Sequence, residues 1–180
     1  MKMVKRLVAA LLVGAMLMLL VGCSASSGGG IVVGGGSSVS EVIQCMNAHR
    51  ESNPIKNNAV LARGAALILD SMANEEDTEW YESTTGIYVR AYISDRIDGT
   101  EIYVNKLNTY VLTDTGLKKI NGGWSRFEAD YADLVYSMTD AKAAVLATAG
   151  ENVVDGISVG VATKAIKGKT CMVIVTDGNL

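Results

Sequence analysis

The residues that could carry chemistry are few, and the single histidine, His49, is the first to consider. Catalysis by a serine or cysteine nucleophile needs an imidazole positioned as its base, and only His49 can supply one. It follows a helical apolar pattern and stands beside Arg50, where an exposed or half-buried structural role is expected. The sequence therefore predicts no Ser–His or Cys–His catalytic site.

Acid–base catalysis would need paired carboxylates or a reactive amine. The candidate acids lie among other charges on faces that we expect to be exposed, which favours solvated carboxylates; they are Asp130 with Asp133, Glu75 with Asp77, and Glu79. Lys142 would have a lowered pKa only if it were buried, and we expect a surface lysine with its charge in water. No catalytic residue is predicted, so we expect a protein that is not an enzyme.

Aromatic side chains are the better candidates for a binding site. Exposed aromatic rings can form a platform for sugars or peptides, although core packing can explain most of them. The residues that we place in a possible cleft are Trp80, Tyr88, Tyr92 and Lys142.

The chain has three cysteines, Cys23, Cys45 and Cys171. A disulfide between Cys45 and Cys171 would close most of the domain into one loop and stabilise it by about 4–5 kcal/mol in the chain-entropy view. Two buried free thiols are the alternative, and the sequence leaves both open. No Cys-x-x-Cys or Cys/His spacing indicates a metal site, and we expect no cofactor.

The first 23 residues indicate where the protein is located. Lys2, Lys5 and Arg6 precede the uncharged run Leu7–Val21, which suits a signal peptide and is short for a membrane span of roughly 20 residues. The following Leu20-Val21-Gly22-Cys23 resembles the lipobox of bacterial lipoproteins, in which the cysteine receives a diacylglyceryl group. The resemblance implies a signal peptide over 1–22 and a lipid anchor at Cys23, on the extracytoplasmic side of the cell membrane or on the outer membrane of a two-membrane cell. An ordinary cleaved signal and an uncleaved anchor are the alternatives.

Charge and composition narrow the classes of partner. Without Lys2, Lys5 and Arg6 the chain keeps 13 basic residues against 19 acidic ones, a net charge of −6. An acidic surface argues against nucleic acid and against an anionic membrane surface as partners. Residues 23–37, rich in Gly and Ser, are expected to be a flexible linker, and residues 38–180 are long enough for one domain.

Hydrophobic spacing predicts an α+β domain. Ser38 and Glu41 form a capping box, and Asn57 or Asn58 is expected to cap a second helix. We expect helices at 38–51, 57–75, 127–138 and 141–147, strands at 86–93, 101–112, 157–163 and 170–176, and a loop at 113–123. Helices first, a mixed middle and a final hairpin indicate α and β layers with antiparallel strand pairing.

This order of elements resembles the CAP superfamily, the SCP-like extracellular domain. Residues 42–53 resemble its first helix through Asn47 and Arg50, residues 59–74 its next helix, and residues 124–175 its closing half, with Val159-Gly160-Val161-Ala162 as a strand. The resemblance implies a three-layer α–β–α sandwich with an antiparallel central sheet.

The departures from this family bear on function. The intact family cleft holds two His and two Glu that can bind a divalent cation, but Lys142 stands at one His position and His49 lies outside both. Gly150-Glu151-Asn152 spells a family motif, but after the loop that it should precede. We therefore expect no metal site and a domain that binds a glycan, lipid or protein ligand. An envelope hydrolase with a carboxylate and Tyr or Lys site, and a structural or adhesion lipoprotein of another α+β fold, are the alternatives.

Overall fold

The computed structural model describes residues 32–33, 36–74, 78–83, 86–92, 107–121, 126–154 and 156–180. Its helices are α2 (Ser37–Met46), α3 (Ala59–Ala73), α4 (Tyr131–Leu134) and α5 (Asp140–Asn152). Its strands are β1 (Val32–Val33), β2 (Thr78–Ser83), β3 (Gly86–Tyr92), β4 (Asn108–Thr113), β5 (Gly116–Lys119), β6 (Arg126–Asp130), β7 (Val159–Ile166) and β8 (Lys169–Thr176). Cys23 and the apolar run before it lie outside the described residues. Within these ranges no helix combines the length and the hydropathy that crossing a membrane requires.

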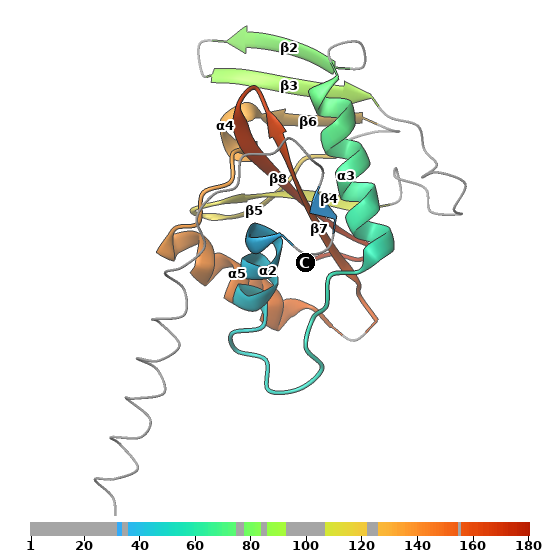
Figure 1. Cartoon of the computed structure of the whole chain (residues 1–180). Coiled ribbons are helices and arrows are strands. Elements are labelled where there is room, and N and C mark those ends of the chain that lie inside the picture. Colours follow the sequence, from blue (N-terminus) through green and yellow to red (C-terminus); the bar gives the residue numbers. More distant parts are fainter. Residues whose placement is uncertain are drawn as a thin grey trace, which may run out of the picture.

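The main sheet is antiparallel and has the order β1-β7-β8-β4-β5 (Figure 1). The terminal hairpin β7–β8 forms its centre, with Val161 opposite Ile174, and turns at Lys167 and Gly168, both at positive φ. The expected hairpin at the end of the chain is confirmed, and so is the α+β class. Val32 and Val33 pair with β7, and Ser37 already belongs to α2, so the expected linker 23–37 contains ordered elements.

Helices cover both faces of this sheet, because its central strands bury alternate residues on opposite sides. Val173 and Val175 of β8 pack in one cluster with Leu61, Ile68 and Met72 of α3. Met172 and Ile174 pack in the other with Val42 of α2 and Leu146 of α5. The continuous apolar run in β8 therefore reflects burial on both faces, as expected for such a strand.

Two glycines let the helices approach closely. A Cβ on Gly160 of β7 would come within 2.3 Å of backbone atoms of Leu61 and Ala62, so only glycine allows α3 to lie against the strand there. A Cβ on Gly150 of α5 would lie 1.8 Å from the carbonyl oxygen of Met46 at the end of α2. The Gly-Glu-Asn sequence at 150–152 thus begins with a residue that the α2–α5 contact requires.

A second sheet, β2-β3-β6, contacts α3 away from α5 (Figure 1). The helix expected at 127–138 is wrong: Phe127 lies on β6, α4 has one turn capped by Asp130, and the chain then extends along β8. There Tyr136 N donates to Thr170 O, and Val135 forms a bridge with Cys171. Phe127, Leu134 and Val135 meet one core from three short elements, whereas Tyr136 and Met138 pack against the other. Helical spacing therefore arises without a continuous helix.

Other helix and strand boundaries in the structure differ from those expected from the sequence, each for a local reason. The N-cap of α2 is Gly36, which has no side chain to cap the helix. Ser38 and Glu41 therefore lie inside α2 and form no capping box, and Glu41 accepts a hydrogen bond from the Tyr136 hydroxyl. Asn58 does cap α3, accepting from Val60 N and Leu61 N. The expected loop 113–123 contains β5, which forms a hairpin with β4 around Asp114 and Thr115. Helix α5 extends to Asn152 instead of ending near 147.

Candidate functional site

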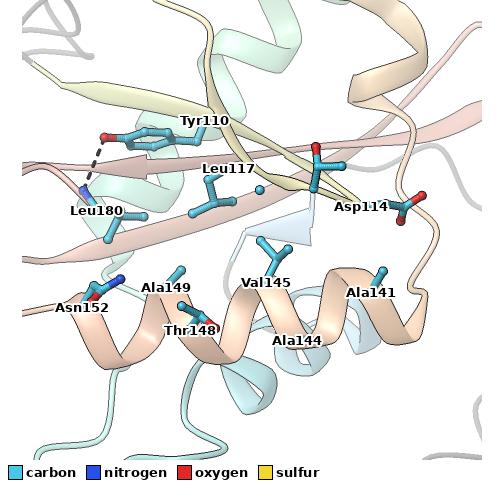
Figure 2. A pocket seen from close by; sticks show the side chains of 12 residues that line it. Tyr110, Asp114, Leu117, Ala141, Ala144, Val145, Thr148, Ala149, Asn152 and Leu180 are labelled. Atoms are coloured by element: carbon cyan, nitrogen blue, oxygen red, sulfur yellow. Dashed lines mark hydrogen bonds between the residues drawn. The ribbon is translucent and has the colours of Figure 1, made fainter.

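A groove of about 580 Å³ lies between the β4–β5 hairpin and α5 (Figure 2). We call it the α5 groove. Its lining comes from the two strands and their turn, from one side of α5 and from the last described residue: Tyr110, Asp114, Thr115, Gly116, Leu117, Ala141, Ala144, Val145, Thr148, Ala149, Asn152 and Leu180.

Small side chains on α5 keep the α5 groove open. Ala141, Ala144 and Thr148 are exposed along it, whereas Leu146 faces the core. Leu117 lies between the Tyr110 ring and α5, and the ring extends toward Leu180 (Figure 2). The Tyr110 hydroxyl accepts a hydrogen bond from Leu180 N at 3.4 Å. The surface of the groove therefore mixes apolar side chains with hydroxyl and amide groups in nearly equal parts.

The turn end of the groove is tied to the start of α5 by Thr139. Its hydroxyl donates to Asp114 Oδ1 at 2.8 Å and accepts from Lys142 N at 3.1 Å, which also makes it the N-cap of the helix. One side chain thus joins the hairpin turn to the helix. We infer that it fixes the width of the groove at this end.

The other end of α5 is held by the segment after α2. Arg50 Nη1 donates to the carbonyl oxygens of Gly150 at 2.6 Å and Val153 at 2.9 Å. His49 Nδ1 lies 2.7 Å from Glu151 Oε1, with both side chains more than half exposed. His49 therefore contacts a surface carboxylate, and its expected structural role fits this position.

The side chain of Asn47 orders the loop that follows α2. Its Nδ2 donates to Ile55 O at 2.8 Å and its Oδ1 accepts from Ile55 N at 2.7 Å. Asn47 and Arg50, the pair on which the family resemblance partly rests, thus both hold backbone. Asn57 holds the backbone of β7 in the same way: its Nδ2 donates to Val161 O and its Oδ1 accepts from Val161 N.

Lys142 does not face the α5 groove. Its Nζ donates to Ser137 O at 3.1 Å, and the space between Lys142, Leu112, Tyr136 and Met172 is too small to admit a water molecule. At the position that resembles a family ligand site, the described residues therefore leave no cavity.

The residues expected to share a cleft with Lys142 come from elsewhere in the fold. Trp80 lies on β2, and Tyr88 and Tyr92 lie on β3, which Figure 1 places at the far end of the molecule from α5. The expected cleft of Trp80, Tyr88, Tyr92 and Lys142 is therefore not formed as one site. Sequence order gave no indication that β2 and β3 belong to a separate sheet.

Cys45 and Cys171 are free thiols on opposite faces of the main sheet. Burial raises the pKa of the Cys171 thiol to about 11. Burial, followed by the Glu41 carboxylate, raises the pKa of Cys45. Neither thiol is activated as a nucleophile, and the disulfide considered from sequence is not formed.

Two of the carboxylates considered for catalysis, Asp130 and Asp133, serve local structure. Asp130 accepts from Ala132 N at the start of α4, and Asp133 lies 2.9 Å from Lys118 Nζ. Among the described residues no three His, Cys, Asp or Glu side chains gather as a metal site. Glu75 and Asp77 lie outside those residues.

The sequence did not predict the α5 groove. The Asp114-Thr115-Gly116 sequence is a turn signal that could have located the hairpin, but nothing in the sequence indicated that α5 would lie beside it. Comparisons with family models, with curated proteins and with solved structures each returned no match.

Proposed function

We propose that this chain is a lipid-anchored extracytoplasmic protein whose CAP-like domain, a three-layer α–β–α sandwich, binds an envelope or extracellular ligand without catalysis. The ligand site is the α5 groove. The observation that carries the proposal is the lining of this groove: its described residues include one carboxylate, Asp114, and no histidine, cysteine, lysine or arginine.

Such a lining suits recognition better than reaction. Ligand sites in proteins are concave and mainly apolar, with a few polar groups that orient the ligand. The α5 groove offers Tyr110, Thr148 and Asn152 as such groups, while the Asp114 carboxylate already accepts a hydrogen bond from Thr139. The other titratable side chain of the lining, the Tyr110 phenol, accepts a hydrogen bond from Leu180 N.

The CAP-like assignment is supported by α3 and β7, which lie where the resemblance expects a helix and a strand, and by coverage of the main sheet on both faces. Asn47 and Arg50 hold backbone around the α2–α5 contact, a role that can persist when a ligand set is lost. In this proposal the domain keeps a CAP-like framework and has replaced the family cleft by the packing around Lys142.

The groove is tested by filling it. Ala144→Trp places a large side chain in the groove, and Ala59→Trp places the same side chain on the exposed start of α3, outside it. The full-length protein in detergent is screened against soluble cell-wall glycan fragments, random octapeptides and phosphatidylglycerol vesicles. We expect one probe class to bind and Ala144→Trp to weaken it about tenfold or more, with Ala59→Trp unchanged. Equal binding by both variants, or turnover of a cell-wall substrate abolished by a groove substitution, would overturn the proposal.

The anchor is tested separately. Cys23→Ala should release the protein from membranes or block its processing, because stable anchoring depends on the acyl chains. Cell fractionation and the mass of the mature chain are the measurements. Full membrane retention at the normal mature size would contradict lipidation.

A further inference from the structure

The outer edge of β5 borders the α5 groove. β5 is the last strand in the order of the main sheet and pairs with β4 alone among the described strands. Helix α5 runs beside it, and Leu117 lines the groove between them (Figure 2). A sheet edge with unpaired backbone groups is a template for another strand.

The register of β4–β5 shows which backbone groups face this edge. Ile120 N donates to Thr109 O at 2.9 Å, which places this pair at a hydrogen-bonding position of the ladder. The pair's other two groups bond elsewhere, Thr109 N to Asn121 Oδ1 and Ile120 O to Glu128 N of β6. Such pairs alternate along an antiparallel ladder, which makes Val111 with Lys118 and Thr113 with Gly116 the next ones. The N–H and C=O of Leu117 therefore point away from β4.

Leu117 also presents its side chain to the groove. It lies opposite Leu112, which packs in the same cluster as Val145 of α5. An added strand that exchanged both hydrogen bonds with Leu117 would place the opposing side chain on this same face of the sheet. That side chain would enter the groove beside Ala144 and Val145.

The charges on β5 indicate the kind of strand that fits. Lys118 and Lys119 are consecutive exposed lysines in an acidic chain. Lys118 pairs with Asp133, whereas Lys119 Nζ donates to the uncharged Asn108 side chain at 2.5 Å. A second copy of β5 would bring lysines together, which is unfavourable between paired strands. A strand with a carboxylate opposite Lys119 is complementary.

We propose that β5 binds an extended, acidic polypeptide segment of another protein by antiparallel strand addition. An apolar side chain lies opposite Leu117 in the α5 groove, and a carboxylate lies opposite Lys119. Because the added strand runs against β5, the acidic residue precedes the apolar one by two positions, giving an acidic-x-apolar signature. This inference rests on the proposed binding function and names its ligand class.

The first experiment selects ligands. The full-length protein in detergent micelles is used to enrich binders from a displayed library of random octapeptides. We expect enriched peptides to share the acidic-x-apolar signature and to bind Ala144→Trp about tenfold more weakly. Lys119→Glu should reduce binding, and an acidic-to-lysine change in the peptide should restore it.

The second experiment tests the backbone pairing. N-methylation of the apolar peptide residue removes the N–H that donates to Leu117 O, and should weaken binding about tenfold or more. N-methylation of the residue before it, whose N–H faces away from β5, is the matched control. On peptide binding, hydrogen exchange of the Leu117 amide should slow, while that of Lys118, already paired with Val111, should not change.

The outcomes separate this inference from the proposed function. Peptides could bind in a way that depends on Ala144 but without the alternating N-methyl effect and without protection of the Leu117 amide. That result would overturn strand addition but leave the α5 groove as a ligand site. Glycan or vesicle binding in the groove, with no peptide enriched, would do the same. Failure of every probe would overturn both.

Discussion

At the scale of single residues, Arg50 has the clearest structural role. Its guanidinium donates to two carbonyl oxygens at the end of α5, those of Gly150 and Val153, and Gly150 O also accepts from Val153 N. We expect Arg50→Ala to lower the free energy of unfolding by about 2 kcal/mol, since hydrogen bonds to charged groups contribute roughly 1.5–3 kcal/mol.

Urea denaturation measures this loss. Arg50→Lys is the matched control: it keeps the charge but lacks the planar guanidinium, whose Nε also donates to Asn53 O, so its stability should fall between wild type and Arg50→Ala. A loss below about 0.5 kcal/mol in Arg50→Ala, the range of ordinary surface substitutions, would show that Arg50 does not hold α5.

Tyr136 gives a pH prediction at the same scale. Burial, then the hydrogen bond and charge of Glu41, raise the pKa of its phenol. The folded state therefore holds this proton more tightly than the unfolded state, whose tyrosine pKa is about 10. Its contribution to stability is complete below about pH 10 and is lost as the pH rises above it.

Tyr136→Phe isolates this contribution from those of Tyr131, Cys45 and Cys171, whose pKa values are also raised. Urea unfolding between about pH 8 and 11 should show a wild-type stability that falls more steeply than that of the variant above pH 10. Parallel curves for the two proteins would contradict a raised Tyr136 pKa.

At the scale of elements, the sequence predicted the helices and strands that their own local sequence pattern specifies. Helix α3 has an Asn58 cap and a stripe with Leu61, Ile68 and Met72 buried, and β7–β8 has its turn glycine. The segment 127–138 could not be read this way, because Phe127 and Leu134 reach one core from a strand and a separate helical turn. The groove depends on where α5 lies, and alanines on every side of that helix conceal its buried face.

The close contact between α3 and β7 can be tested at Gly160. Gly160→Ala would place a Cβ against the backbone of Leu61 and Ala62, so α3 must move away from β7. We expect a loss of about 3 kcal/mol, at the upper end of overpacking effects. Ala165→Val, at an exposed position of the same strand, should stay within about 0.5 kcal/mol of wild type because β-branched residues suit strands. Similar stabilities for the two variants would mean that α3 does not pack there as closely as the structure has it.

At the scale of the whole molecule, the main sheet separates the two thiols. Cys171 packs with α3 on one face, and Cys45 packs near the other face. A bond between them would have to pass through the sheet, so we expect the intact mass of the air-exposed protein to equal that of the dithiol. In native protein, iodoacetamide should react slowly with Cys171, which is fully buried, and in denaturant both thiols should react. A mass about 2 Da lower, with neither thiol alkylated in denaturant, would show that Cys45 and Cys171 are bonded. The two cysteines would then lie on the same face of the main sheet, and α2 would have to pack against it differently.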